Sequence, residues 1–308
     1  MGKRQGTLDA IDMSAITSTT APPPDSSSDR TSPHVDRRMR VLDLNADLGE
    51  GVRTADLDTE ALDAALVEIV TSANVACGGH AGDAASMARV CRDAVTRGVA
   101  IGAQVSYVDP SGFGRTRLEI PHDILVGQLL VQIRDLAGHA REAGGALAHV
   151  KPHGALYNAA ADDLHVATAV VEAVLRHADA TGVALPLFAL PGCALAQEGV
   201  RRGIPVVSEA FADRAYLADG RLVPRSRDGS VITDVDEVVA RVMRLATEGV
   251  IRSIDGIDVA VTARSLCLHS DTDGALLLAG RVRAALNAAG VRLEAFVPAT
   301  LPRTDASS

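Results

Sequence analysis

Short apolar segments alternate with longer amphipathic segments over most of the chain, and this alternation restricts the fold more than any other feature of the sequence. Each short segment begins apolar and ends in polar residues or glycine, as buried parallel strands do. The pattern is typical of βα units that build a parallel sheet. Seven strands are predicted, at residues 40–49, 69–78, 99–107, 145–154, 186–192, 204–213 and 264–271.

Amphipathic segments fill the intervals between these strands. Residues 123–143 place apolar side chains at the 3.6-residue period, which gives one stripe that can lie on a sheet. Seven strands with six crossovers form either a closed barrel or an open doubly wound sheet, and in both architectures ligands bind at the carboxyl ends of the strands. Helices are predicted at residues 59–70, 84–97, 123–143, 162–180, 194–201, 235–248 and 273–289.

The two ends of the chain differ from its middle in composition. Residues 1–38 are rich in Ser, Thr, Pro and Asp and cannot bury enough apolar surface to offset chain entropy, so they are predicted to form a disordered leader. Residues 299–308 are predicted to form a short polar tail. Residues 39–298 are then expected to form a single catalytic domain, a size that α/β barrels commonly reach.

Charge and cysteine usage exclude several classes of protein. The net charge of -9, without a basic stripe, argues against a nucleic-acid partner. No apolar run approaches the ~18 residues that a membrane span needs, so no membrane partner is expected. Cys77, Cys91, Cys193 and Cys267 lie far apart, which suggests neither a disulfide framework nor a structural zinc site. We therefore expect a cytoplasmic protein.

Polar and ionisable side chains gather near the ends of six predicted strands. A single Asp or His at such a position is more often a capping or turn residue, but coincidence over six strands indicates a polar pocket. In a pocket of this kind, carboxylates and imidazoles shift one another's pKa and exchange protons with a substrate. The candidate site residues are Asn45, Asp47, Asn74, His80, Gln104, Lys151, His153, Tyr157, Asn158, Glu209, Asp213, Arg214 and His269.

Six motifs in series resemble the LamB/YcsF family, which is also known as the family of 5-oxoprolinase A subunits. They are LDLNADLGE, TSANVACGGHAGD, AIGAQVSYVDPSGFGR, HVKPHGALYN, SEAFADRAY and LCLHSD. The resemblance implies an α/β fold, a seven-stranded TIM-like (β/α) barrel similar to the glycoside hydrolase/deacetylase superfamily. It also implies ATP-dependent hydrolysis of 5-oxo-L-proline to L-glutamate with partner subunits B and C, and Mg²⁺ as the counter-ion of ATP.

The resemblance also suggests roles for the candidate residues. Asp47, His80 and His153 are expected to move protons, and Lys151 and Arg214 to hold the carboxylate or phosphate of the lactam substrate. Asp47, His80, His153 and Lys151 form the expected catalytic set. The expected substrate-binding residues are Asn45, Asn74, Gln104, Tyr157, Asn158, Glu209, Asp213, Arg214 and His269.

One departure from the family pattern bears on whether the site binds a metal ion. The third motif usually has His and Pro where this chain has Gln104 and Val105. A carboxamide cannot take up and release a proton as an imidazole does, and it binds transition metals more weakly, so no metal is expected in the site.

Two further hypotheses remain open. One is a metal-dependent, deacetylase-like hydrolase with Asp47, His80 and either His153 or His269 as ligands. The other is a non-catalytic subunit of a lactamase or amidase complex. The sequence does not determine the oligomeric state, and a homo-oligomer stays among the alternatives.

Overall fold

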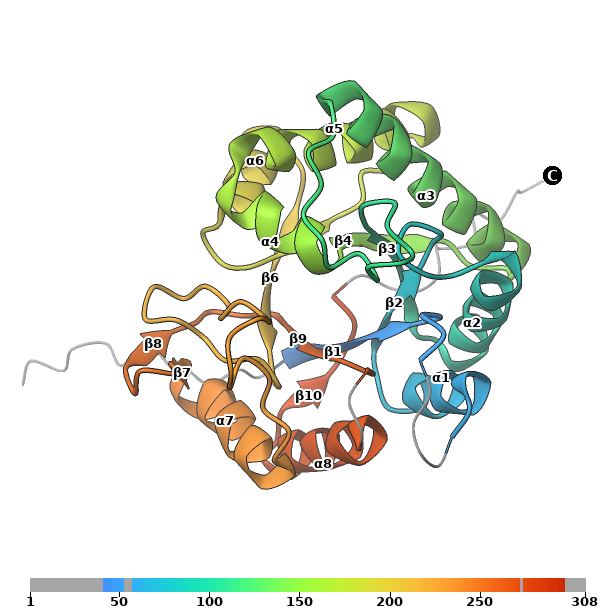
Figure 1. Cartoon of the computed structure of the whole chain (residues 1–308). Coiled ribbons are helices and arrows are strands. Elements are labelled where there is room, and N and C mark those ends of the chain that lie inside the picture. The colour runs from blue at the N-terminus through green and yellow to red at the C-terminus, as the bar shows by residue number, and fades with distance from the viewer. Residues whose placement is uncertain (1–40, 53–56, 272–273, 297–308) are drawn as a thin grey trace, which may run out of the picture. The chain divides into compact units, whose positions relative to one another are not determined.

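Seven parallel strands pair side to side in a closed ring, so the barrel is formed and the open sheet is not. The computed structural model describes residues 41–52, 57–271 and 274–296. In ring order the strands are β1 (Val41–Leu48), β2 (Ser72–Ala76), β3 (Ala100–Val105), β4 (Leu147–Pro152), β5 (Leu187–Ala189), β6 (Val206–Phe211) and β9 (Ser265–Leu268). The ring closes because β9 pairs with both β6 and β1. Figure 1 shows the strands surrounded by helices.

All seven predicted strands and all seven predicted helices are present, with boundaries that differ by a few residues. The helices are α1 (Thr59–Val67), α2 (Ala84–Arg97), α3 (His122–Glu142), α4 (Gly154–Asp162), α5 (Leu164–Thr181), α6 (Ala194–Arg201), α7 (Val235–Glu248) and α8 (Ala275–Ala288). Local capping explains some of the agreement. Asp83 accepts a hydrogen bond from the backbone N–H of Ser86 and forms a capping box at the start of α2. Asp234 caps α7 in the same way, through the backbone N–H of Glu237.

Helix α4 was not predicted, and it changes the placement of two candidate residues. The sequence places Tyr157 and Asn158 near the end of a strand, whereas both lie on α4, which begins directly after β4. The turn between β4 and α4 depends on Gly154, whose φ is 56°. A Cβ at this position would lie 2.6 Å from the carbonyl oxygen of Gly114. Glycine therefore allows the chain to pass from strand to helix without a longer loop.

Three short strands were also missed. Strands β7 (Val250–Arg252) and β8 (Asp258–Ala260) form an antiparallel hairpin, and β10 (Arg292–Leu293) pairs with the start of β1. None of the three belongs to the closed ring. They are two or three residues long, which is too short to show a period in the sequence.

The alternation of side chains along β1 separates the hydrophobic core from the barrel interior. Leu42, Leu44, Ala46 and Leu48 are buried in the main hydrophobic core. The intervening Asp43, Asn45 and Asp47 bond to polar side chains of other barrel strands. Because successive side chains of a strand point to opposite faces, the apolar set packs outward and the polar set points into the barrel. The interior of this barrel is therefore polar, unlike the branched apolar interior of most TIM barrels.

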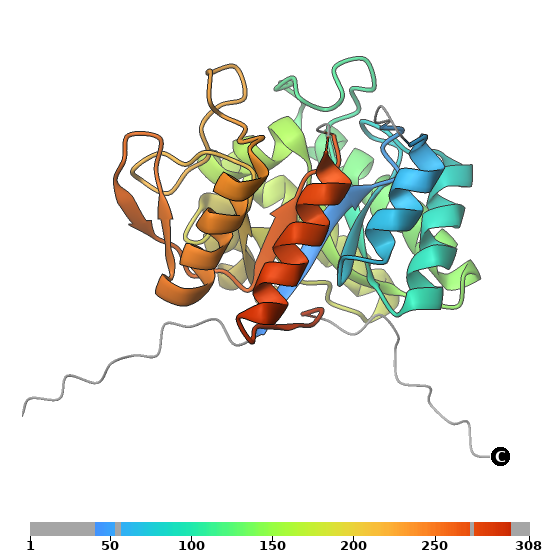
Figure 2. The same cartoon turned by 90° about the horizontal axis from the view of Figure 1, so that it is seen from below.

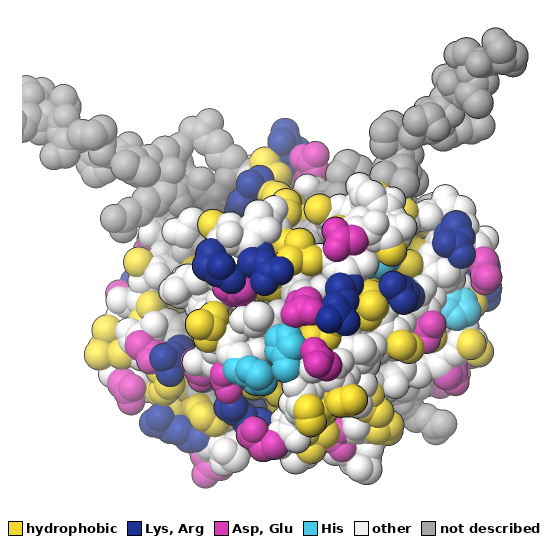
Figure 3. Space-filling model, turned by 90° about the horizontal axis from the view of Figure 1, so that it is seen from above, with side chains coloured by type: hydrophobic (Ala, Val, Ile, Leu, Met, Phe, Trp, Pro, Cys, Tyr) yellow, Lys and Arg dark blue, Asp and Glu magenta, His cyan; other side chains and the backbone are white. Residues whose placement is uncertain are grey.

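The predicted leader (residues 1–38) and tail (residues 299–308) lie outside the described residues. No described helix has the length and apolarity that crossing a membrane requires. On the face of the molecule shown in Figure 3, acidic and basic side chains are interspersed with small hydrophobic areas.

Candidate active site

A cavity of about 520 Å³ opens at the carboxyl ends of the barrel strands. Its walls come from the loop after β3, from α4 and from the loop after β6. Figure 2 shows these two loops standing at the same end of the barrel. Seven of the predicted site residues line the cavity: Asp47, Lys151, His153, Tyr157, Asn158, Arg214 and His269.

The other six predicted residues do not line the cavity. They are buried and contact lining residues or their neighbours. These six are Asn45, Asn74, His80, Gln104, Glu209 and Asp213.

Lys151 is the central charge of the barrel interior. Its Nζ lies 2.7 Å from Glu209 Oε1 and 3.6 Å from Asp47 Oδ1. It also donates to Asn45 Oδ1 and to Cys267 Sγ, both at 3.0 Å. Burial alone would favour neutral lysine, but the attraction of Asp47 and Glu209 raises the pKa of Lys151 above its ordinary value. Lys151 is therefore a charged group whose charge is already compensated from within the barrel.

Asp47 is ionised for the same reason. Burial by itself would raise the pKa of the Asp47 carboxyl, but the Lys151 ammonium holds it well below its usual range. Asn74 Nδ2 donates to Asp47 Oδ1 at 2.9 Å, which fixes the orientation of the carboxylate. The result is a buried, oriented carboxylate at the bottom of the cavity.

A line of hydrogen bonds below the cavity supports Asp47. His149 Nε2 donates to Asn74 Oδ1 at 2.9 Å, and the His149 ring stacks on Phe188 with the centroids 4.0 Å apart. The ring fits because it lies against Gly102, where a Cβ would come within 1.9 Å of Nε2. Burial lowers the pKa of His149 to about 3, so the ring is neutral at physiological pH. His149 therefore contributes to the position of Asp47 through Asn74.

His269 is held in the orientation of a proton carrier. Its Nδ1 bonds both carboxylate oxygens of Asp213, at 2.9 and 3.0 Å, and its side chain is 11 % exposed in the cavity wall. Burial alone would raise the pKa of Asp213, but the contact with His269 lowers it below its ordinary value. Among the described residues, Nε2 of His269 has no hydrogen-bond partner. A carboxylate that orients one imidazole nitrogen leaves the other available for general acid–base chemistry.

His153 and His80 form a second, more enclosed pair. Their rings stack 3.7 Å apart with an interplanar angle of 6°. Both nitrogens of His153 are engaged: Gln104 Nε2 donates to Nδ1 at 3.0 Å, and Nε2 donates to the carbonyl of Phe113 at 3.2 Å. His80 bonds Glu50 Oε1 through Nε2 at 2.9 Å, and burial lowers its pKa. These two imidazoles are less available to a substrate than His269.

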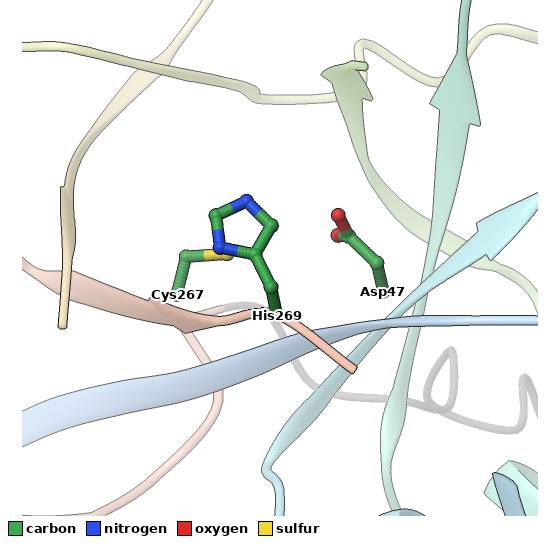
Figure 4. A group of neighbouring side chains, drawn as sticks. All are labelled: Asp47, Cys267 and His269. Atoms are coloured by element: carbon green, nitrogen blue, oxygen red, sulfur yellow. The ribbon is translucent and has the colours of Figure 1, made fainter. Parts of the chain in front are cut away.

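Two groups of side chains have the composition of a metal site. In the first, ligand atoms of Asp47, Cys267 and His269 lie within 4.8 Å of one another, and Figure 4 shows their side chains facing a common space beside β1 and β9. Lys151 Nζ lies 3.0 Å from Cys267 Sγ, and burial keeps the pKa of this thiol well above its ordinary value. A protonated thiol beside an ammonium group is a poor environment for a second cation, so this group does not fit a metal.

The second group is Glu50, His80 and His153, whose ligand atoms also lie within 4.8 Å of one another. Two imidazoles and a carboxylate suit zinc. In the observed amide orientation, Gln104 Nε2 donates to Glu50 Oε1 and His153 Nδ1, two of the atoms that would bind the ion. Rotation of the Gln104 amide would place Oε1, which otherwise lacks a partner, at this position. This group therefore fits a metal better than the first.

Several residues of the site were missed at the level of sequence. His149 was not chosen, although it alternates with Lys151 and His153 along β4 and so faces the same interior. Four arginines of the cavity wall were also missed, namely Arg115, Arg117, Arg221 and Arg225. Arg115 ends the motif AIGAQVSYVDPSGFGR and could have been found there, whereas Arg221 and Arg225 lie in an irregular loop without a periodic pattern.

The neutral state of His149 predicts a specific loss of stability in acid. Below pH 6.5 the unfolded chain binds a proton at this residue and the folded chain does not, down to about pH 3. The free energy of unfolding should therefore fall as the pH is lowered through this window, by about 5 kcal/mol from this residue over the whole window. In His149→Gln, which keeps an N–H donor, we expect a smaller dependence on pH, measured by urea unfolding between pH 7.5 and pH 4.5. A constant difference between variant and wild type over this range would contradict the prediction.

Three comparisons relate this chain to known proteins. The LamB/YcsF family matches residues 42–300. A Streptomyces avermitilis protein that is named as the A subunit of 5-oxoprolinase is 53 % identical over 256 residues, which cover 83 % of this chain and 100 % of the relative. A Mycobacterium avium protein of the same name is 46 % identical over 258 residues, covering 84 % of this chain and 100 % of the relative. The solved structure of a lactam utilization protein from Thermus thermophilus has a TM-score of 0.74 and 40 % identity, and covers 83 % of this chain and 100 % of that protein. On its sequence and its fold, this chain belongs to the LamB/YcsF family.

Proposed function

We propose that this chain is the A subunit of a 5-oxoprolinase, which opens 5-oxo-L-proline to L-glutamate in an ATP-dependent reaction with partner subunits B and C. The observation that carries the proposal is the match over the full length of relatives that are named as A subunits of 5-oxoprolinase. The cavity supports it, because an ionised carboxylate, an oriented imidazole and several arginines suit the hydrolysis of an anionic cyclic amide.

The chemistry explains why ATP is needed. A five-membered lactam is stabilised by amide resonance, and its amine stays tethered after release, so direct attack by water is slow and easily reversed. Phosphorylation of the lactam oxygen removes this resonance. We assign ATP, with Mg²⁺ as its counter-ion, to the partner subunits, because the sequence contains no GxxxxGK[ST] loop.

In this proposal His269 and Asp47 act on the phosphorylated lactam. A water molecule adds to the ring carbon and passes a proton to Nε2 of His269, while Asp213 stabilises the resulting imidazolium through Nδ1. The proton then moves to the ring nitrogen as the bond between carbon and nitrogen breaks, which leaves an acyl phosphate. A second water, oriented by Asp47, displaces phosphate and gives glutamate. The sum consumes one ATP and two waters for each lactam.

The remaining predicted residues act in this proposal as positioning or binding groups. Asn45, Asn74 and Glu209 hold Lys151 and Asp47 in place. Tyr157 and Asn158 of α4 lie at the cavity wall, where they can contact the ring. His80 and Gln104 hold His153 by stacking and by hydrogen bonding.

The first test of the function is a coupled glutamate assay. We expect the isolated chain to release almost no glutamate from 5-oxo-L-proline, because the lactam is not activated. Glutamate should form when the B and C subunits and ATP are added together, and omission of any one component should abolish it. Rapid turnover by the isolated chain without ATP would refute the proposed role.

A second test separates His269 from the other histidines. His269→Asn should lower the turnover of the assembled enzyme by roughly a hundredfold or more, because a general acid–base group is lost. His165→Asn is the matched control, since His165 is an exposed residue of α5 away from the cavity, and its turnover should be unchanged. Equal turnover of His269→Asn and the control would show that another residue carries the proton.

A metal-dependent hydrolase is the second candidate function, and the group of Glu50, His80 and His153 is the observation that favours it. We expect no stoichiometric zinc in the purified wild-type chain, because the Gln104 amide is a weak ligand. Gln104→His should increase zinc uptake, whereas Gln197→His, at an exposed position of α6, should not. Inductively coupled plasma mass spectrometry measures both. One tightly bound transition metal in each wild-type chain would favour the metal-dependent hydrolase over the ATP-dependent 5-oxoprolinase.

A further inference from the structure

The cavity carries an excess of positive charge in a chain whose net charge is -9. Of the described residues that line it, only Asp47 and Asp162 are acidic. The basic lining residues are Lys151, Arg115, Arg117, Arg214, Arg221 and Arg225. A cavity that concentrates one sign of charge between low-dielectric walls attracts ligands of the opposite sign.

Most of these cations already have acidic partners. Lys151 is compensated by Glu209 and Asp47 inside the barrel. Three arginines nearer the surface form ion pairs, which are Arg115 with Asp271, Arg117 with Asp163 and Arg221 with Asp162. These pairs leave little charge for a ligand.

Arg214 is different, because it is 3 % exposed and, within the described part of the chain, its side chain donates only to backbone carbonyls. Its Nε donates to the carbonyl of Ser230 at 3.1 Å, and its Nη2 donates to the carbonyl of Val223 at 2.6 Å. Among the described residues, no carboxylate forms an ion pair with its guanidinium group. Arg214 is thus a buried cation without an anionic partner, an arrangement that is costly unless a ligand supplies the charge.

Arg225 lies in the same wall and adds a second incompletely paired cation. Its Nη1 is 3.5 Å from Asp271 Oδ2, and Asp271 is shared with Arg115. Burial, together with the nearby Arg225, lowers the pKa of Arg214 to about 10. The adjacent Asp213 does not balance them fully, because His269 engages both of its oxygens. Two arginines therefore line one cavity, and the described carboxylates around them do not fully balance their charge.

We propose that Arg214 and Arg225 form the binding subsite for the dianionic phosphoryl group of the phosphorylated lactam. This inference rests on the proposed function and extends it, since it names the residues of this chain that bind the phosphoryl group of the activated lactam. A phosphate monoester carries a charge of about -1.5 to -2 at neutral pH, which matches two cations better than a single carboxylate does. Guanidinium groups also offer paired N–H donors that suit phosphate oxygens.

The subsite lies next to His269, the residue that receives a proton in the proposed reaction. Arg214 directly follows Asp213, so the residue that orients His269 and the residue that binds the anion are held by the same turn after β6. His269 and Arg225 line the same cavity. A phosphoryl group bound there would lie beside the imidazole that receives the proton of the attacking water.

Isothermal titration of the full chain with inorganic phosphate, at low ionic strength and without chloride, tests the subsite. Phosphate should bind to the wild type, and more tightly than acetate. Arg225→Gln should weaken phosphate binding by roughly tenfold to a hundredfold, the effect expected for the loss of one charge-assisted contact. Arg214→Gln should do the same. Arg281→Gln is the matched control, because Arg281 is an exposed residue of α8 that pairs with Asp236, and it should bind phosphate as the wild type does.

Arg225→Gln is the decisive variant, because the side chain of Arg225 is 29 % exposed and its one described ion pair is 3.5 Å long, whereas Arg214 donates to two backbone carbonyls. Unchanged phosphate affinity in Arg225→Gln would overturn the proposal. The proposal would also be overturned if Arg225→Gln weakened the binding of acetate and 5-oxo-L-proline but not that of phosphate, because the subsite would then bind carboxylates. Much tighter binding of ADP than of phosphate would overturn it too, because the subsite would then bind nucleotides.

The titration and the glutamate assay can fail separately, so the subsite and the proposed function are tested independently. If the wild type forms glutamate with its partners but does not bind phosphate, the subsite alone is wrong. If phosphate binds and depends on Arg225, yet no mixture of subunits and ATP yields glutamate, the proposed function is wrong and the anion site stands.

Discussion

The ammonium group of Lys151, buried within the barrel, is the interaction on which the rest of the site depends. It brings Glu209 of β6 and Asp47 of β1 close to one cation from β4, so three strands that are distant in sequence meet through charge. A buried ion pair that loses one partner leaves an uncompensated charge, which is strongly destabilising. The same compensation keeps Asp47 ionised and prevents Lys151 from serving as a free clamp for a substrate anion. We propose that Arg214 and Arg225, in the loop after β6, bind this anion instead.

A polar interior is possible here because the hydrophobic core lies elsewhere. Leu44, Ile133 and Val170 belong to the large cluster between the strands and the surrounding helices, and all are at most 1 % exposed. Inside the ring, Asn45 and Asn74 use their amides to link Lys151, Asp47 and Glu209. Each buried polar group needs a partner, and the network supplies most of them. The hydrophobic cluster outside the ring of strands thus stabilises the fold, and the polar network inside the ring sets the electrostatics of the site. The hydrogen bonds of this network hold the side chains of the site in fixed positions.

The sequence predicted the repeating elements well and the orientation of single side chains poorly. The seven barrel strands were found because each is an apolar run that ends in polar residues, whereas closure of the ring depends on the pairing of β1 with β9, more than 200 residues apart, which no local pattern encodes. Helix α4 was missed because Gly154 joins it to β4 without a loop. Lining residues on strands could be found from their place at the end of a predicted strand, as Asp47 was. Arg225 could not, because its loop has no period and its position depends on tertiary contacts.

Gln104 determines how one imidazole of the site is used. Its Nε2 donates to Nδ1 of His153, which assigns the proton of that ring to Nε2 and directs it to the carbonyl of Phe113. His153 thereby becomes a fixed wall of the cavity, stacked on His80. His269 has one nitrogen held by Asp213 and the other directed at the cavity without a described partner. Where an imidazole would have supplied a further proton carrier or ligand at position 104, the carboxamide supplies only directional hydrogen bonds. In the proposed mechanism, proton transfer therefore depends on the pair of His269 and Asp213, which stands next to Arg214, a cation without a carboxylate partner among the described residues.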